Sequence, residues 1–498
     1  MNTKLLSSLC LPALAITSLK AANEKPNILF IFADDQCFES LYSQHEYDKD
    51  IETPNLDKLM ARGVSFTQAH NQGGWSPGVS VASRTMLNTG QYLWRAAQTN
   101  NRAQTGRTDP NSPKVMPEYT VAVKPVPKLW SQYMREAGYE TYMAGKWHLT
   151  TKAQKVFDHT GTVRGGMPKQ HPACYARKFN GKTEDAWKPY DPQYGGFWAG
   201  GTHWSEVLRD EAVGFLNHSK TVDKPFFMYV AFNSAHDPRQ SPKEYVDAYP
   251  AEDIAVPKNF TPGYPYATEI GTGSYLRDEK LAPFPRNKRS VQVNRQEYYA
   301  IIAHMDKQIG EILNTLEATG QDKNTYIFFT ADHGIAIGDH GFMGKQNMYE
   351  KSVRVPLIVC GPNVPSGKKI DEYVYLQDVM PSVLELAGVE KPEHVDYHSL
   401  MPMATGKTKK SAYEYIYGSY IGVQRMVKGD GYKMIIYPTA KVIRLYDLKK
   451  DPLEMKDLAT RKNKAIMTKL FAKLRELQIR VEDPLDMTPY FNEIMEKL

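Results

Sequence analysis

The fold of this chain is decided by one stretch of eleven residues, Ser80-Val81-Ala82-Ser83-Arg84-Thr85-Met86-Leu87-Asn88-Thr89-Gly90. Glycines and a proline between residues 73 and 78 make the approach to it an irregular loop. From Ser83 onward the residues suit a short helix, so we expect Ser80 at or just before a helix N-terminus. Free backbone N–H groups and the positive end of the helix dipole favour an anion at that place.

Arg84 follows Ser80 by four residues, so a helical path brings its guanidinium back over the serine. That pair would put a cationic clamp for an oxyanion beside a hydroxyl nucleophile. Serine before a helix is more commonly an ordinary cap. The residues alone leave both interpretations open.

The stretch resembles the signature of type I sulfatases, Cys/Ser-x-Pro/Ala-x-Arg followed by four residues and Thr-Gly. In that family the first residue is oxidised after synthesis to formylglycine (3-oxoalanine), the catalytic nucleophile, and here that residue would be Ser80. Serine at this position, with Ala82 in place of proline, resembles the variant that radical-SAM enzymes mature in anaerobic bacteria. The resemblance therefore implies a formylglycine-generating maturation partner of the radical-SAM type.

Polar residues follow several predicted buried strands. Residues 26–33 form an apolar run that ends at Asp34 and Asp35, and further strands are expected at 139–144, 225–232 and 325–330, each leading to a polar cluster. These clusters are Lys146 with His148, then His236, and finally Asp332 with His333. Sites in open α/β sheets lie at the carboxyl ends of strands, so we expect the four clusters to meet.

Each cluster has a simpler explanation when it is taken alone. A pair of aspartates after a strand is usually a turn or a cap, and a lone histidine there is usually structural. Together, however, Asp34, Asp35 and Asp332 supply the hard anionic oxygens that suit a divalent cation, most simply Ca²⁺.

In the sulfatase family a cation is held by two aspartates after the first strand, the formylglycine oxygen and an Asp-Asn or Asp-His pair. The resemblance places this metal site on Asp34, Asp35, Ser80, Asp332 and His333. A histidine at the last position weakens the argument for an all-oxygen site, so Mg²⁺ or another divalent ion stays open.

Three further matches imply roles for residues around the sulfate. Lys146 and His148 stand in Gly-Lys-Trp-His, which resembles the family's Gly-Lys-x-His, whose lysine contacts the sulfate and whose histidine bonds the formylglycine hydrate. His236 stands in His-Asp-Pro and resembles the histidine that protonates the leaving alcohol. Lys345 resembles the second sulfate-binding lysine, and Arg84 would also face the sulfate oxygens.

The implied fold is α/β and alkaline-phosphatase-like, with a large mixed, mostly parallel sheet between helices. We expect helices at 54–62, 129–137, 204–216, 296–319 and 379–387, a strand at 355–359, and a long loop region over 150–202. After about residue 405 short alternating segments at 413–417, 424–428, 433–437 and 442–447 predict a smaller antiparallel sheet, with a helix near 464–479. We therefore divide the chain into a signal peptide (1–21), a catalytic domain (22–404) and a C-terminal subdomain (405–498).

The N-terminus indicates the compartment. Lys4 precedes an apolar run over residues 5–16, and small residues return at Ala21 and Ala22, as in a secretory signal peptide. That run is too short to cross a bilayer, and no other segment reads as transmembrane. The remaining cysteines, Cys37, Cys174 and Cys360, are odd in number and argue against a disulfide framework. We expect a secreted, periplasmic protein.

Composition narrows the class of partner. With 62 Lys and Arg against 56 Asp and Glu the net charge is +6, and hydrophobic residues make up 41% of the chain, as in soluble globular proteins. The sequence has no dense basic run, so we do not expect it to bind nucleic acid. A slightly positive protein with a cationic cleft suits anionic substrates.

We therefore expect a sulfuric ester hydrolase that acts on a sulfated carbohydrate, such as a terminal sugar of a host or algal glycan. Two alternatives are a phosphatase or phosphodiesterase of the same superfamily that uses unmodified Ser80, and a non-catalytic glycan-binding relative. The sequence does not identify the sugar or the position of its sulfate. Candidate residues for a sugar subsite are His171, Arg177, Trp198, His203, Trp204 and Arg239.

Overall fold

The computed structural model describes residues 25–41, 51–100, 119–175 and 177–498. The predicted signal peptide lies outside these residues. Within them, no helix has both the length and the apolar composition needed to cross a membrane.

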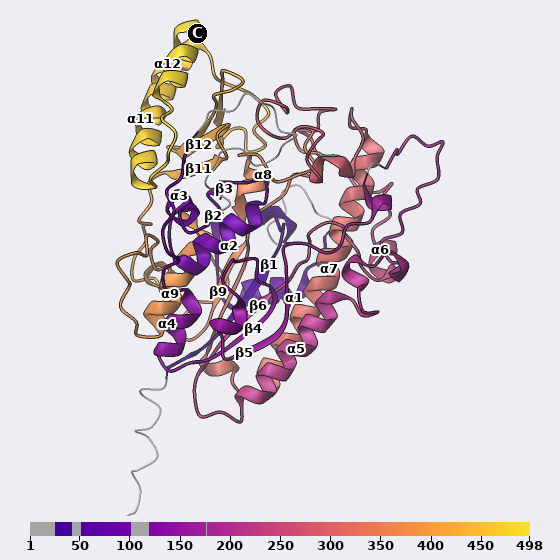
Figure 1. Cartoon of the computed structure of the whole chain (residues 1–498), viewed down its shortest axis with the longest axis vertical. Coiled ribbons are helices and arrows are strands. Elements are labelled where there is room, and N and C mark those ends of the chain that lie inside the picture. Colours follow the sequence, from indigo (N-terminus) through magenta and orange to yellow (C-terminus); the bar gives the residue numbers. More distant parts are fainter. Residues whose placement is uncertain (1–24, 42–50, 101–118, 176) are drawn as a thin grey trace, which may run out of the picture.

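A large sheet of nine strands forms the centre of the molecule (Figure 1). The strands are β1 (Asn27–Ala33), β2 (Val64–His70), β4 (Glu140–Lys146), β5 (His159–Arg164), β6 (Phe226–Ala231), β7 (Thr325–Ala331), β8 (Arg354–Val355), β9 (Leu357–Cys360) and β10 (Lys368–Tyr375). Their order is β10-β2-β9-β7-β1-β6-β4-β5, with β8 beside β2. The strands from β7 to β5 pair in parallel, whereas β9 is antiparallel to both of its neighbours. The predicted mixed, mostly parallel sheet is confirmed.

Helices cover both faces of this sheet (Figure 1). They include α1 (Pro54–Arg62), α2 (Val79–Thr89), α3 (Leu93–Ala97), α4 (Trp130–Glu136), α5 (Trp204–Ser219), α6 (Lys243–Asp247), α7 (Lys288–Ala318), α8 (Glu350–Val353), α9 (Val379–Leu386) and α10 (Met401–Ala404). Helices α1, α5 and α6 contact α7, while α2, α4 and α9 contact one another. The long helix α7 begins eight residues earlier than the predicted 296, because the side chain of Asn287 accepts the Ser290 N–H and caps it there.

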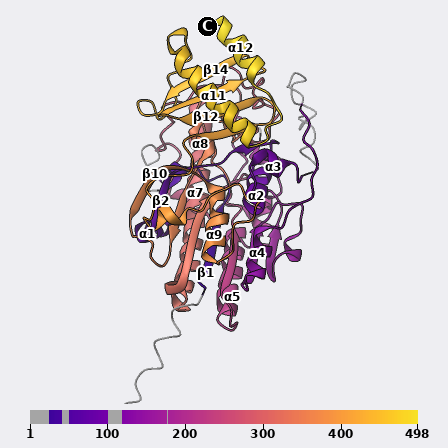
Figure 2. The same cartoon turned by 90° about the vertical axis from the view of Figure 1, so that its left-hand side faces the viewer.

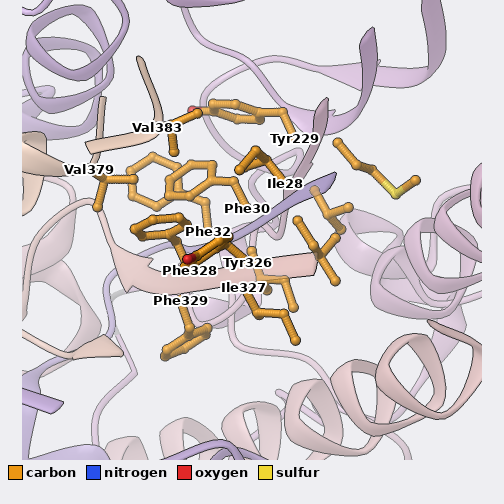
Figure 3. Packing of buried hydrophobic residues seen from close by; sticks show 14 of the residues in the cluster. Ile28, Phe30, Phe32, Tyr229, Tyr326, Ile327, Phe328, Phe329, Val379 and Val383 are labelled. Carbon is orange, nitrogen blue, oxygen red and sulfur yellow. The ribbon is translucent and has the colours of Figure 1, made fainter. Parts of the chain in front are cut away.

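Aromatic packing between the sheet and the second group of helices explains why the central strands are apolar throughout. Phe30 and Phe32 of β1 lie beside Tyr229 of β6, with ring centroids 4.9 and 6.1 Å from the tyrosine (Figure 3). Val379 and Val383 of α9 close the same cluster. Full burial of each such ring contributes about 1.5–3 kcal/mol, so β1 and β6 form a rigid base for the residues at their carboxyl ends.

A second, smaller sheet has the order β14-β13-β12-β11-β3. Its strands are β3 (Gly73–Gly74), β11 (Ile416–Tyr420), β12 (Gln424–Gly429), β13 (Tyr432–Tyr437) and β14 (Val442–Asp447), and the helices α11 (Lys464–Arg480) and α12 (Thr488–Lys497) follow them in the chain. Figure 2 shows these helices at the outer end of the molecule. Four strands pair antiparallel as predicted, with the first one starting three residues later than expected.

The fifth strand, β3, was not predicted, and it connects the small sheet to the loop before Ser80. It pairs in parallel with β11 through Gly73 and Gly74. Gly73 has φ +89°, and a Cβ there would lie 2.0 Å from the Ser419 carbonyl oxygen, so only glycine fits. Two glycines carry no strand pattern, which is why the sequence did not reveal this pairing.

The region 150–202 also differs from the expected loop, because β5 lies inside it at the edge of the large sheet. Its residues are mostly half-buried and lack an alternating apolar pattern. Cys37, Cys174 and Cys360 are buried free thiols, in agreement with the expectation of no disulfide framework.

Candidate active site

The predicted polar clusters meet at one edge of the large sheet. Asp34 and Asp35 directly follow β1, Lys146 is the last residue of β4, and Asp332 directly follows β7. Because β7, β1, β6 and β4 are neighbours in the sheet, their carboxyl ends bring these side chains together. All four side chains are fully buried.

Ser80 lies at the centre of this group. It is the second residue of α2, whose N-terminus points at the sheet edge, and only 3% of it is exposed. Its Oγ lies 3.1 Å from Asp34 Oδ1, 3.0 Å from His333 Nε2 and 3.1 Å from Lys146 Nζ. The predicted nucleophile therefore touches both the acidic cluster and a lysine.

The acidic cluster fits a divalent cation. Ligand atoms of Asp34, Asp35, Asp332 and His333 all lie within 4.8 Å of one another. The Nδ1 of His333 donates to the Gly334 carbonyl at 2.9 Å, which leaves the Nε2 lone pair facing Asp35 Oδ1 at 3.3 Å. A lone pair facing a carboxylate is favourable when a cation lies between them, and a histidine whose Nδ1 bonds a backbone carbonyl is a common metal ligand.

Three cations surround these carboxylates. Lys146 bonds Asp34, Lys345 Nζ lies 2.7 Å from Asp35 Oδ1, and Arg84 Nε lies 3.1 Å from Asp332 Oδ2. Burial works against ionisation of Asp332, yet neighbouring cations that include Arg84 and Lys146 hold its pKa well below the ordinary value. Burial also lowers the pKa of Lys345, but Asp35 and Asp278 outweigh it and raise that pKa. Asp332 and Lys345 are therefore held in their charged forms, whereas burial raises the pKa of Asp34 and lowers the pKa of Lys146.

Arg84 is placed differently from the predicted clamp over Ser80. Its Nη1 donates to the Lys146 carbonyl at 2.9 Å, and its guanidinium lies 4.5 Å from the ring centroid of Phe32. The side chain is fully buried and is not part of the cavity wall beside Ser80. The helical spacing places Arg84 one turn from Ser80, as predicted, but its guanidinium points to Asp332 and not to the serine. The reason is that the buried carboxylate of Asp332 attracts the guanidinium more strongly than a neutral hydroxyl does.

A cavity of about 420 Å³ opens in front of Ser80. Its wall includes Ser80, Lys146, His148, His236 and Lys345, so five of the predicted residues share one hollow. This volume is within the usual range for a small-molecule site.

The two histidines of the cavity differ in their surroundings. Burial, followed by Lys146 and Arg84, lowers the pKa of His148 to about 2, and its Nδ1 has no hydrogen-bond partner. His148 is therefore neutral near pH 7. His236 Nδ1 lies 2.7 Å from the Asp237 carbonyl oxygen and 3.1 Å from Asp237 Oδ1, which leaves Nε2 directed toward the cavity side.

Sequence reasoning missed Arg277 and Asp278, which also line the cavity. Arg277 Nη2 lies 3.3 Å from His236 Nε2 and 3.1 Å from Asp237 Oδ1. Both residues come from the Pro- and Gly-rich segment 257–290, which has no periodicity that could mark a site.

Most of the residues expected at a sugar subsite have internal roles instead. Arg177 pairs with Asp185 and Glu297, His203 caps α5 and bonds the Gln240 carbonyl, and Arg239 is 1% exposed. Trp198 donates to the Pro189 carbonyl and Trp204 packs under Arg164. Within the described residues, only His171 of the six lines a cavity that adjoins Ser80.

Two protein-family models match this chain. Residues 26–389 match the family model described as Sulfatase. Residues 338–480 match the model described as N-sulphoglucosamine sulphohydrolase, C-terminal. The first match covers the large sheet and every residue of the cluster around Ser80.

Individual relatives of this chain are also named as sulfatases. The chain is 28% identical to a sulfatase of Formosa agariphila, over 86% of this chain and 82% of that one. It is 26% identical to an N-acetylglucosamine-6-O-sulfatase of Bacteroides thetaiotaomicron, over 91% and 87%. A solved structure in complex with its substrate D-glucosamine-2-N,6-O-disulfate superposes with a TM-score of 0.69 at 22% identity, covering 93% of this chain and 99% of that one. The chain belongs to the sulfatase family and is a hydrolase of sulfate esters.

Proposed function

We propose that this sulfatase removes an O-sulfate group from a sulfated carbohydrate, with Ser80 matured to formylglycine and a divalent cation held by Asp34, Asp35, Asp332 and His333. The observation that carries the proposal is the position of Ser80 Oγ, within 3.1 Å of Asp34, His333 and Lys146 at the floor of a cavity. A sugar substrate is supported by the two relatives above whose names or ligands include glucosamine.

Formylglycine and the cation would supply two kinds of chemistry. Hydrated formylglycine at residue 80 would supply an attacking oxygen and a second hydroxyl. A divalent cation, with Ca²⁺ and Mg²⁺ both compatible with this donor set, would supply positive charge against the anionic substrate.

The side chains of the cavity supply the rest. Lys146 and Lys345 are the two lysines on the cavity wall that Ser80 also lines, so we assign them to the sulfate oxygens, where preorganised charge lowers the barrier. His236 is held by Asp237 through Nδ1, and its Nε2 contacts Arg277 on the cavity side. We assign it to protonation of the leaving sugar oxygen, with the substrate displacing that contact. The neutral His148 lines the same cavity as Ser80, so we assign it to a hydrogen bond with the nucleophile. Arg84 holds Asp332 and the Lys146 backbone in place.

We also propose secretion to the periplasm and maturation by a radical-SAM enzyme, on the N-terminal segment and the serine-type stretch described above. The mass of the mature N-terminus tests the first point, and oxidation of Ser80 only in cells that carry such an enzyme tests the second.

The experiment is mass spectrometry of the peptide that contains Ser80, on protein produced anaerobically with a maturation enzyme, together with sulfate release from O-sulfated sugars. We expect a loss of two hydrogens at residue 80 and sulfate release in the same preparation, and neither in Ser80→Ala. An intact serine in a protein that hydrolyses phosphate esters would contradict the proposal and favour the phosphatase alternative. An intact serine in a protein that binds glycans without cleaving them would favour the non-catalytic alternative.

A further inference from the structure

A second cavity, of about 590 Å³, adjoins the one in front of Ser80. The two share Pro77, Leu276 and Arg277 in their walls, so they are neighbouring parts of one hollow surface. A substrate whose sulfate reaches Ser80 must extend away from the floor of the first cavity. The second cavity is the space into which such an extension can pass.

The wall of the second cavity is positively charged. Arg277 and Lys280 both line it, and among the described residues no aspartate or glutamate does. Arg277 is already neutralised, because it pairs with Asp237 and Asp278. Lys280 is exposed, and no carboxylate of the described residues lies within ion-pair distance of it, so it is the cation that remains for a ligand.

Neighbouring acids do not cancel this charge. Lys280 belongs to the short 3₁₀ helix Asp278–Leu281, where Asp278 bonds Arg277 and Glu279 bonds the buried Arg286. Both carboxylates on the element of Lys280 are therefore engaged elsewhere.

Aromatic rings and hydrogen-bond donors complete the wall. His171 accepts the Ala173 N–H through Nδ1 at 3.2 Å, so the proton of the neutral ring lies on Nε2, which is a donor. Tyr175 and Tyr275 line the same cavity and offer apolar ring faces of the kind that line small-molecule sites. Cations, donors and ring faces together suit a sugar that carries an anionic group.

We propose that the second cavity binds the sugar next to the one that loses its sulfate, and that Lys280 contacts an anionic group, a sulfate or a carboxylate, on that second sugar. This inference rests on the proposed function, since it assumes a carbohydrate sulfate at Ser80. Lys280 then sets specificity for oligosaccharides with a second negative charge.

The test first finds the sulfated monosaccharide that the matured enzyme cleaves, from a panel of O-sulfated hexoses and hexosamines. That sugar is then linked to glucose, to glucuronic acid and to glucose 6-sulfate. For wild type we expect kcat/KM to be higher for the two charged disaccharides. Lys280→Gln lowers kcat/KM about 10-fold for the charged ones, as for loss of a charge-assisted hydrogen bond, and leaves the neutral one unchanged.

Two controls separate charge from structure. Lys280→Arg restores most of the preference, and Lys407→Gln, which removes one exposed lysine that lines neither cavity, changes nothing. The glucuronic acid and sulfate arms show which anion is recognised.

The outcomes distinguish the two proposals. If the matured enzyme releases sulfate from no member of the panel, the proposed function fails and this inference falls with it. A second outcome is that sulfate is released but Lys280→Gln changes kcat/KM equally for neutral and charged disaccharides, or changes it for neither. In that case the role of Lys280 is wrong while the proposed function stands.

Discussion

Among the described residues, one cluster of buried charge lies at Ser80 and another lies where the small sheet meets α8. The second, here called the lysine–glutamate cluster, consists of Lys428, Lys433, Glu350 and Glu454, each less than 9% exposed. In it Lys433 Nζ lies 2.8 Å from Glu350 Oε1 and 2.8 Å from Glu454 Oε1. A lysine thus occupies the position between the carboxylates.

The Ser80 cluster has the opposite arrangement. Its lysines lie outside and each is hydrogen-bonded to one aspartate, while ligand atoms of Asp34, Asp35, Asp332 and His333 lie close to one another. Burial and paired charge therefore do not mark a catalytic site by themselves. The feature on which we base the proposed site is the convergence of lone pairs beside Ser80, the proposed nucleophile, and a cavity.

The largest expected effect follows from removing one of the carboxylates that converge beside Ser80. Asp332→Asn removes a carboxylate that faces His333 and holds Arg84, so kcat/KM for a sulfate ester falls at least about 10³-fold, or about 4 kcal/mol of barrier. Steady-state kinetics on the matured protein measures this. Glu350→Gln, in the other cluster, leaves kcat/KM of the folded protein unchanged. Equal losses in both variants would contradict the distinction between the clusters.

Breaking the lysine–glutamate cluster instead costs stability. Lys433→Met leaves Glu350 and Glu454 buried without their shared cation, which costs about 3–5 kcal/mol of the free energy of unfolding. Urea unfolding measures the loss. The control is Lys441→Met, since Lys441 pairs with Glu493 on the surface and its removal changes little. A stable Lys433→Met protein with lost activity would reverse our assignment of the two clusters.

A third change sharpens the comparison within the active site. A Cβ on Gly166 would lie 2.5 Å from the His148 ring, so Gly166→Ala displaces that ring and lowers kcat about 10- to 100-fold with little change in Tm. Gly165→Ala is a matched control, because no atom lies within 4 Å of a Cβ at that position. Similar kinetics for the two variants would show that the position of His148 does not matter.

The smallest effect concerns pH. Burial, opposed by Lys433, raises the pKa of Glu454 from 4.5 to about 7 in the folded protein. Between these values the folded state binds more protons than the unfolded state, so this group's contribution to stability falls as pH rises through the window. Glu454→Gln should therefore reduce the fall in unfolding free energy between about pH 5 and pH 7.5. An identical pH dependence in the variant would show that Glu454 does not titrate there.

Much of this site could be predicted, because a buried strand is recognisable as an apolar run and the polar residue that ends the run marks the end of the strand. Apolar runs place Asp34, His236 and Asp332 at carboxyl ends that must lie together in a parallel sheet. Lys345 was identified only through the resemblance to a family motif, since a lysine on a loop carries no pattern of its own.

Other features depend on tertiary contacts that a sequence does not encode locally. The direction of Arg84 is set by Asp332, which lies 248 residues away in the chain. Strand β3 consists of two glycines, which are recognisable as a strand only because they pair with β11. Arg277 and Lys280 belong to a segment without a periodic pattern, and only the structure shows that they line cavities.

The measurement that tests the central claim most directly is thermal unfolding with and without Ca²⁺ or Mg²⁺, because it reports cation binding apart from catalysis. A cation bound only by the folded state raises Tm. We predict a rise for wild type and for Glu350→Gln, and none for Asp35→Asn, whose carboxylate faces His333 in the Ser80 cluster. No rise in wild type, or an equal rise in Asp35→Asn, would contradict the claim that the lone pairs around Ser80 converge on a divalent cation.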